Sequence, residues 1–281
     1  MTGIDLITVP YDSGVRGRWM GAGPDELLDR GVEDRIGPDV RTRIVDIGED
    51  LPEIRSAARL HREVAELVRG GGPPFLLAGN CNTTVGLVAG ITGRTDDLGV
   101  VWFDAHGDFN TPESSPSGFF DGMALAMLTG GCWRPLTAAV PGFRPVPEAN
   151  VVLAGARDLD EGERALIEAS ELHVVPPGEV HADGLTAALR RLPPTVTRIH
   201  LHVDLDVHDL DTVGRANAYA AGGGPDARQV RNAVAAVAEA YPIAGATLSA
   251  YNPFADSGSG IQDAALDLAE QIGGFLRRAL D

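Results

Sequence analysis

Two short segments of the chain alternate acidic side chains with histidines, and these residue types at this spacing could bind metal ions. In "VVWFDAHGDFN", residues 100–110, Asp104, His106 and Asp108 occupy alternate positions. In "RIHLHVDLDVHD", residues 198–209, apolar residues alternate with histidines and aspartates. Side chains at alternate positions of a strand point to one side, so each segment is expected to present its polar groups together.

Packed carboxylates indicate a cation. Several carboxylates that lie close together repel one another and resist ionisation unless a positive charge lies among them. Carboxylate oxygens with a few imidazoles suit Mn²⁺ and similar hard divalent ions. Two such clusters at neighbouring strand ends could hold two ions with bridging carboxylates, an arrangement that ionises a water molecule for hydrolysis. The alternative, solvated strand ends without metal, explains one such segment more readily than two.

The elements that must position these residues follow from the hydrophobic pattern. Short apolar runs predict strands at residues 4–10, 42–48, 74–80, 98–106, 150–157, 171–177, 197–207 and 245–253. Stretches with helical spacing lie between them at residues 51–70, 161–170, 183–193 and 225–242. This alternation indicates an α/β fold: a single three-layer domain, residues 1–281, with a mostly parallel central sheet of about eight strands flanked by helices. Ligands bind beyond the carboxyl ends of such strands, where both polar segments lie.

Composition restricts the partners. The formal net charge of −17 disfavours nucleic acids and anionic membrane surfaces, so a small-molecule substrate is the expected partner. The chain has no lysine, which excludes Schiff-base and P-loop chemistry. Its first residues are typical of a strand rather than a signal peptide, no apolar run is long enough to span a membrane, and its two cysteines are too few for a disulfide scaffold. We therefore expect a cytoplasmic protein.

One family shares these motifs. "DAHGDFN" together with "DLD" resembles the metal motifs of the arginase and agmatinase group, the ureohydrolases. Four further segments resemble that family in the same order: "VPYDSGVRGRWMGAGPDELL", "SGFFDGMALAML", "GARDLDEGE" and "YNP". The resemblance implies an arginase-like fold, hydrolysis of a guanidino or amidino group with two divalent metal ions, most often manganese, and a homotrimer or homohexamer.

The resemblance also implies roles for individual residues. Six positions match metal ligands: Cys81, Asp104, His106, Asp108, Asp204 and Asp206. Asp104 and Asp204 match the bridging positions, and Asp108 also matches the carboxylate that hydrogen-bonds the attacking hydroxide. Asp121 stands where arginases carry a histidine that shuttles protons, so Asp108 and Asp121 are the expected catalytic residues.

Four positions match arginase residues around the amino-acid end of the substrate. Asn110 and Ser117 match residues near the α-carboxylate, and Asp160 and Glu163 match those that receive the α-amino group. The last pair favours an amino acid over the decarboxylated amine that agmatinases use. The alternative is that "DLDEGE" is only the acidic start of a helix.

The sequence departs from the family inside the expected site. Cys81, preceded by Asn80, takes the place of a histidine ligand, and a thiolate is a poor match for Mn²⁺. Ala250 replaces a glutamate that holds the guanidinium, Ala218 replaces a nearby threonine, and Phe119 replaces an asparagine. A cationic guanidinium would lose its carboxylate partner here. We therefore expect an arginine derivative with a modified, less basic terminal group, such as Nω-hydroxyarginine.

Two alternatives remain open at this stage. The chain could be a non-catalytic arginase-fold relative with a binding or regulatory role, or it could hold a single metal ion because the position at Cys81 stays empty. His202 lies on the same predicted strand face as Asp204. It could replace the missing histidine as a ligand, or it could pack behind the ligands.

Overall fold

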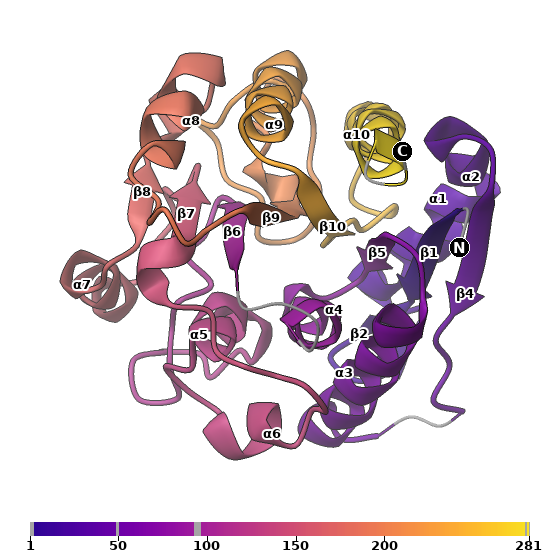
Figure 1. The fold of residues 1–281 in the computed structure, drawn as a ribbon, viewed down its shortest axis with the longest axis horizontal. Coiled ribbons are helices and arrows are strands. Elements are labelled where there is room, and N and C mark those ends of the chain that lie inside the picture. The colour runs from indigo at the N-terminus through magenta and orange to yellow at the C-terminus, as the bar shows by residue number, and fades with distance from the viewer. Residues whose placement is uncertain (1–2, 49–50, 93–96, 279, 281) are drawn as a thin grey trace.

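A parallel sheet of eight strands crosses the middle of the molecule (Figure 1). The structure is a computed structural model that describes the chain apart from residues 1–2, 49–50, 93–96, 279 and 281. The strand order is β4-β1-β5-β10-β9-β6-β7-β8, and neighbouring strands are parallel throughout. The strands are β1 (Ile4–Val9), β4 (Val40–Ile44), β5 (Pro74–Ala78), β6 (Leu98–Phe103), β7 (Val151–Ala154), β8 (His173–Val175), β9 (Arg198–Asp204) and β10 (Ile243–Ser249).

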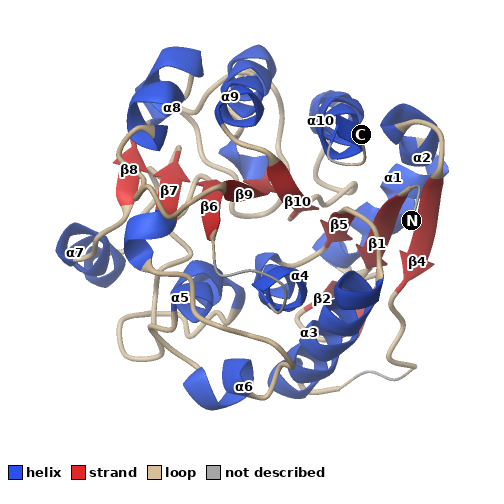
Figure 2. Ribbon diagram, viewed as in Figure 1, coloured by secondary structure: helices blue, strands red, loops and turns tan. Residues whose placement is uncertain are grey.

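Helices cover both faces of the sheet, so the molecule has three layers (Figure 1 and Figure 2). On one face lie α1 (Gly23–Asp29), α2 (Val32–Ile36), α8 (Ala182–Leu189), α9 (Ala227–Ala240) and α10 (Gly260–Arg278). On the other lie α3 (Glu53–Gly70), α4 (Thr84–Thr92), α5 (Ala124–Thr129), α6 (Arg134–Ala138) and α7 (Glu161–Ala169). Each layer forms an apolar core with its own face of the sheet. The predicted three-layer α/β fold is confirmed.

Each strand of the central sheet differs from its predicted range at one or both ends, and β4 and β9 are two examples. β4 occupies Val40–Ile44, whereas the sequence pattern predicts a strand at 42–48. β9 ends at Asp204 instead of continuing, because Leu205–Val207 form a 3-10 turn in which the backbone N–H of Asp206 donates to the Asp204 carboxylate. The regular alternation predicted for this segment therefore stops at Asp204, and His208 lies beyond the strand.

Six of the described α-helices lie outside the predicted helical stretches: α1, α2, α4, α5, α6 and α10. α4 contacts α3 on one side and the strands β5 and β10 on the other. Its described residues are buried all round, so no polar face marks it in the sequence. α10 packs on β10 and against α2 near the C-terminus.

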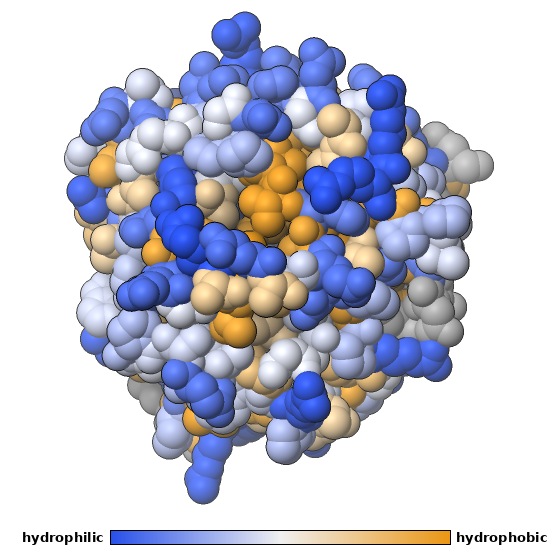
Figure 3. All heavy atoms as spheres, turned by 90° about the vertical axis from the view of Figure 1, so that its left-hand side faces the viewer, coloured by the Kyte–Doolittle hydropathy of each residue, from blue (hydrophilic) through white to orange (hydrophobic). Residues whose placement is uncertain are grey.

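One face of the molecule is drawn by hydropathy in Figure 3. On this face, hydrophilic side chains surround a small hydrophobic area near the middle. None of the described helices combines the length and the apolar character needed to cross a membrane.

The contact between α3 and α4 depends on a glycine. A Cβ added at Gly86 would lie 2.5 Å from the backbone oxygen of His61 and 2.8 Å from its Cα. Both are backbone atoms, so this clash could be relieved only by moving α3 or α4. We expect Gly86→Ala to lower the free energy of unfolding by about 1 to 3 kcal/mol, as overpacking does. Gly274→Ala in α10 is the matched control: nothing lies within 4 Å of its added Cβ, so higher helix propensity should raise stability by about 0.5 to 1 kcal/mol. Urea unfolding of both variants measures this, and equal effects would contradict the close packing.

Candidate active site

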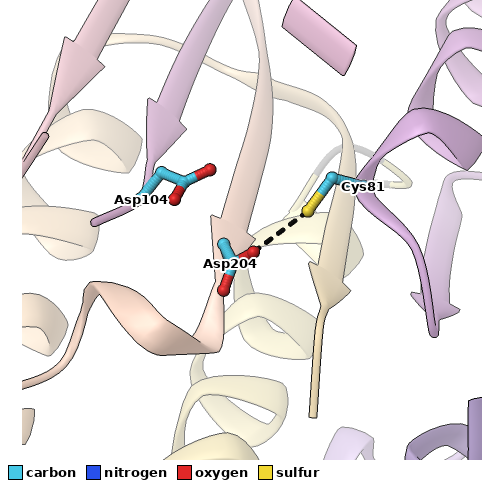
Figure 4. Close-up of side chains that lie close together, drawn as sticks. All are labelled: Cys81, Asp104 and Asp204. Atoms are coloured by element: carbon cyan, nitrogen blue, oxygen red, sulfur yellow. Dashed lines mark hydrogen bonds between the residues drawn. The ribbon is translucent and has the colours of Figure 1, made fainter. Parts of the chain in front are cut away.

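The two aspartate segments meet at the carboxyl ends of adjacent strands. β6 and β9 pair in parallel with their last paired residues in register, so Asp104 and Asp204 lie near one another beyond that pair (Figure 4). Asp104 accepts hydrogen bonds from Trp102 Nε1 at 2.9 Å and from the backbone N–H of His106 at 2.7 Å. Asp204 Oδ1 accepts one from the backbone N–H of Asp206 at 2.7 Å. These bonds fix the carboxylates where the strands end.

Two groups of side chains in the described chain have the atoms and spacing to hold a metal ion. Cys81, Asp104 and Asp204 form one group, and Asp104, His106 and Asp206 form the other. Within each group the ligand atoms lie within 4.8 Å of one another. Asp104 belongs to both groups, as expected of a ligand that bridges two ions.

Burial and mutual repulsion make these carboxylates resist ionisation. Burial, followed by the charge of Asp206, raises the pKa of Asp104. Burial also raises the pKa of Asp204 well above its usual range, with Asp206 and Asp104 adding to the effect. The pKa of Asp108 is likewise raised by burial first and then by Asp104. A positive ion among these groups would remove the conflict.

His106 lies between two carboxylates of the cluster. Its Nδ1 lies 3.3 Å from Asp104 Oδ1 and 3.3 Å from Asp206 Oδ2. Burial acts to lower the pKa of His106, but the charges of Asp206 and Asp104 outweigh it and hold that pKa well above its usual value. Burial likewise acts to raise the pKa of Asp206, yet His106 and a hydrogen bond from Asn217 bring it below its usual value. A metal ion binds neutral imidazole, so a divalent cation can take the place of this proton, and the donor set fits such an ion.

Asp108 lies at the cavity side of the cluster. Its backbone has φ +47°, in the left-handed region that non-glycine residues seldom occupy. The amides of Leu125 and Ala126 both donate to its carbonyl oxygen, at 2.9 and 3.1 Å, and hold this conformation. Its Oδ2 is buried and has no hydrogen-bond partner among the described residues. An unpaired, buried carboxylate oxygen of this kind is suited to bind a cation or a water molecule.

The Cys81 thiol lies between two polar groups. It donates to Asp204 Oδ2 at 3.1 Å (Figure 4) and lies 3.1 Å from Ser249 Oγ. Burial raises the pKa of the thiol well above its usual value, and the charge of Asp204 raises it further. Cys81 must therefore lose a proton against this environment before it can act as a metal ligand.

His202 packs behind the ligands. Its ring stacks on Trp102 with centroids 3.5 Å apart and planes 8° apart. Nδ1 hydrogen-bonds with Thr84 Oγ1 at 2.9 Å, and Nε2 with Ser249 Oγ at 3.2 Å. Ser249 thus lies between the imidazole and the Cys81 sulfur. Both ring nitrogens have partners, so this arrangement favours the packed alternative over a replacement ligand.

Asp121 holds the loop that carries Cys81. Its Oδ1 accepts from the backbone N–H and the side-chain Nδ2 of Asn82 at 2.8 and 2.7 Å. Its Oδ2 accepts from Asn80 Nδ2 and from the backbone N–H of Cys81, both at 3.0 Å. Burial raises the pKa of Asp121 to about 7 even though the hydrogen bonds favour its ionised form. Both carboxylate oxygens therefore accept hydrogen bonds from the loop that carries Cys81. The sequence predicted a proton carrier at Asp121 and gave no indication of these bonds.

A cavity of about 470 Å³ opens beside the metal-ligand groups, and its wall contains all four predicted substrate residues. Asn110 donates to Asp160 Oδ2 at 3.1 Å, whereas Glu163 is buried and accepts from a backbone N–H at 2.9 Å. Ser117 is exposed at this wall. Asp160 is the N-cap residue of α7, but its side chain makes no capping hydrogen bond. The alternative of an acidic helix start explains where Asp160 lies, but its side chain accepts a hydrogen bond from Asn110 and does not cap the helix.

The cavity wall also includes residues that sequence reasoning missed. Asn217 donates to Asp206 Oδ2 at 3.1 Å and to the carbonyl of Ala250 at 3.0 Å. Tyr219 is 49% exposed, and its ring lies 5.1 Å from that of Phe119 across part of the wall. Both missed residues lie on a loop without periodicity, so the sequence offered no signal beyond their closeness to the second aspartate motif.

Comparison with known proteins gives a consistent result. A model of the arginase family matches residues 2–273. The chain is 32% identical to the arginase of Bacillus caldovelox, with 91% of the chain and 93% of that protein covered, and 31% identical to the arginase of Bacillus subtilis (strain 168), with 96% and 97% covered. The crystal structure of arginase from Bacillus cereus superposes with a TM-score of 0.87 at 31% identity, covering 97% of this chain and 98% of that one.

The contacts of Asp121 generate a prediction about its role. An asparagine at this position would turn an NH₂ group toward two N–H donors, so we expect Asp121→Asn to lower the free energy of unfolding by about 3 kcal/mol. Asp158→Asn is the control, because Asp158 also lines the cavity but its side chain is 68% exposed; its stability should not change. Urea unfolding measures both. Full stability of Asp121→Asn combined with slow turnover would instead support proton transfer by Asp121.

Proposed function

Because the chain belongs to the arginase family, we propose that it hydrolyses a carbon–nitrogen bond of a guanidino or amidino group in an arginine-derived amino acid, using two divalent metal ions. One observation carries the proposal: two ligand groups that share Asp104 lie beside a cavity of about 470 Å³. A cavity of this size accommodates a small molecule. When bound, divalent ions would act as Lewis acids toward a water molecule and the substrate.

Asp108 is the proposed proton acceptor. Its buried Oδ2 is unpaired among the described residues, and the side chain lines the cavity next to the ligand groups. From there the carboxylate can accept a proton from the attacking water. It can return that proton to the nitrogen that leaves as an amine, so the proton count balances over one turnover.

The amino-acid end of the substrate is proposed to bind at the opposite part of the wall. Asp160 and Glu163 provide acceptors for an α-ammonium group, and Asn110 and Ser117 provide neutral donors for an α-carboxylate. Among the described residues that line the cavity, none is an arginine. A carboxylate here would therefore rely on hydroxyl and amide donors rather than on a charged partner.

The terminal group of the substrate is proposed to be less basic than a guanidinium. Ala250 and Ala218 contribute only methyl groups to the wall, and the Asp121 carboxylate already accepts four hydrogen bonds. A guanidinium would lack a free carboxylate at these positions. Nω-hydroxyarginine fits better, because its hydroxyl group lowers the basicity and adds a hydrogen-bonding group.

We expect kcat/KM for Nω-hydroxyarginine to exceed that for arginine by about tenfold or more, the ratio that corresponds to one lost charge-assisted contact. Ala250→Glu should reverse this preference, because it restores a carboxylate to the wall at a left-handed position (φ +63°) that alanine already occupies. Ala250→Gln, of similar size but uncharged, is the matched control. Ornithine release from each substrate measures the ratio. A wild-type preference for arginine would contradict the substrate proposal, and no turnover of either would favour the non-catalytic alternative.

We propose manganese as the metal, by analogy with the family. A one-ion hydrolase is the second candidate, and one observation favours it: the Cys81 thiol donates to Asp204 and sits where its pKa is raised. A hard ion such as Mn²⁺ gains little from a soft sulfur ligand. The group of Asp104, His106 and Asp206, which has no thiol, would then be the occupied one.

Metal analysis separates these two candidates. The manganese content of the wild type distinguishes them, with about two ions per chain for the two-ion proposal and about one for the one-ion candidate. Cys81→His should raise the manganese that is retained after dialysis, because an imidazole suits Mn²⁺ better than a thiol does. Asp104→Asn should lower it, because both groups share this carboxylate. Cys81→Ala is the control that removes the thiol without adding an imidazole. Elemental analysis gives the stoichiometry, and an unchanged content in Cys81→His would place Cys81 outside the metal ligands.

We propose a homotrimer or homohexamer on the basis of the family resemblance, and a cytoplasmic location because the two cysteines are too few for a disulfide scaffold. The expected partner remains a small-molecule substrate, in keeping with the net charge of −17. The whole chain, residues 1–281, is proposed to act as one domain.

A further inference from the structure

Arg157 connects three parts of the chain through backbone carbonyl groups. The residue follows β7, and its side chain is only partly exposed. Its guanidinium donates hydrogen bonds of 2.9–3.2 Å to the carbonyl oxygens of Gly155, Asp206, His208, Ala221 and Gly222. A guanidinium carries its N–H donors in a rigid plane, so the smaller, rotating ammonium group of a lysine cannot make the same set of bonds.

The acceptors at Ala221 and Gly222 belong to a loop that we call the strapped loop, residues 209–224. This segment contains no helix or strand. Its two ends are joined by Asp209, whose Oδ2 accepts from the backbone N–H groups of Gly223 and Gly224 at 2.6 and 3.1 Å. Arg157 and Asp209 thus hold the same short stretch, one through its carbonyls and the other through its amides.

The strapped loop builds one wall of the cavity. Asn217, Ala218, Tyr219 and Ala220 all line it. Asn217 connects this wall to the metal-ligand group through Asp206 and to the end of β10 through the carbonyl of Ala250. A loop of this length without regular structure depends on such side-chain bonds for its shape. Loss of the Arg157 hydrogen bonds would therefore shift the cavity wall at residues 217–220.

We propose that Arg157 is a positioning residue that sets the affinity for substrate by holding this wall in place. The inference rests on the proposed function, because the ligand of the wall is taken to be an arginine-like amino acid. Arg157 does not line the cavity, so it acts through the loop rather than by touching the substrate. Arg157 also donates to the carbonyl of Asp206, a candidate metal ligand, so the metal content of each variant must be measured as well.

Arg157→Lys tests the proposal. We expect KM for the better guanidino substrate to rise about tenfold, as lost ground-state contacts do, while kcat stays within about threefold. Manganese content should be unchanged. Hydrogen exchange should accelerate in residues 215–224 more than in the β6 and β9 strands. Asp209→Asn weakens the hydrogen bonds that the Asp209 carboxylate accepts from Gly223 and Gly224. It should give the same pattern, and it serves as the second variant if Arg157→Lys does not fold.

Arg134→Lys is the matched control, since exposed Arg134 donates to one carbonyl, that of Gly130, away from the cavity wall. It should leave KM and exchange unchanged. An unaltered KM in Arg157→Lys, or exchange that rises equally over the whole chain, would overturn the positioning role. If the wild-type protein hydrolyses no guanidino compound, the proposed function fails. The Kd of L-arginine, measured by calorimetry, then replaces KM as the test of the inference. Equal Kd values for the wild type and Arg157→Lys would overturn it.

Discussion

The burial of like charges is the constraint on which the rest of this site depends. Parallel pairing of β6 and β9 brings Asp104 and Asp204 together, and the turn after β9 adds Asp206. Carboxylates removed from water need compensation. Part of it comes from N–H donors, such as the indole of Trp102, and part from the imidazole of His106, whose Nδ1 lies 3.3 Å from oxygens of both Asp104 and Asp206. The two ligand groups that share Asp104 supply the place where a divalent ion would complete it.

Much of this could be predicted because it follows from local pattern. The apolar runs of the central strands are buried on both faces, and their length and sequence identify them without knowledge of their neighbours. The rule that ligands bind beyond the carboxyl ends of parallel strands then places Asp104, His106 and Asp206 in one region. Five of the six expected metal ligands occur in the two groups, and Asp108 lines the adjoining cavity.

The remainder could not be predicted because it depends on contacts between distant segments. Asp121 matches a proton carrier by position, yet its oxygens are engaged by a loop about 40 residues earlier in the chain. The sequence places His202 on the same strand face as Asp204. Stacking on Trp102 and hydrogen bonds with Thr84 and Ser249 determine the orientation of its ring nitrogens. α4 has no exposed face to reveal it over residues 84–91, since all of them are buried. In each case the sequence shows a residue type but not the groups packed against it.

The strand order also has a consequence for how the protein is made. Cys81 follows β5 and Asp204 ends β9, and these strands are separated in the sheet by β10, which comes after both of them in the described chain. Until Ile243–Ser249 inserts between them, the two halves of the sheet have no common hydrogen-bonded edge at the centre, and Ser249 cannot reach the thiol. The group of Cys81, Asp104 and Asp204 therefore forms only after β10 has entered the sheet, whereas Asp104, His106 and Asp206 can come together as soon as β6 and β9 pair.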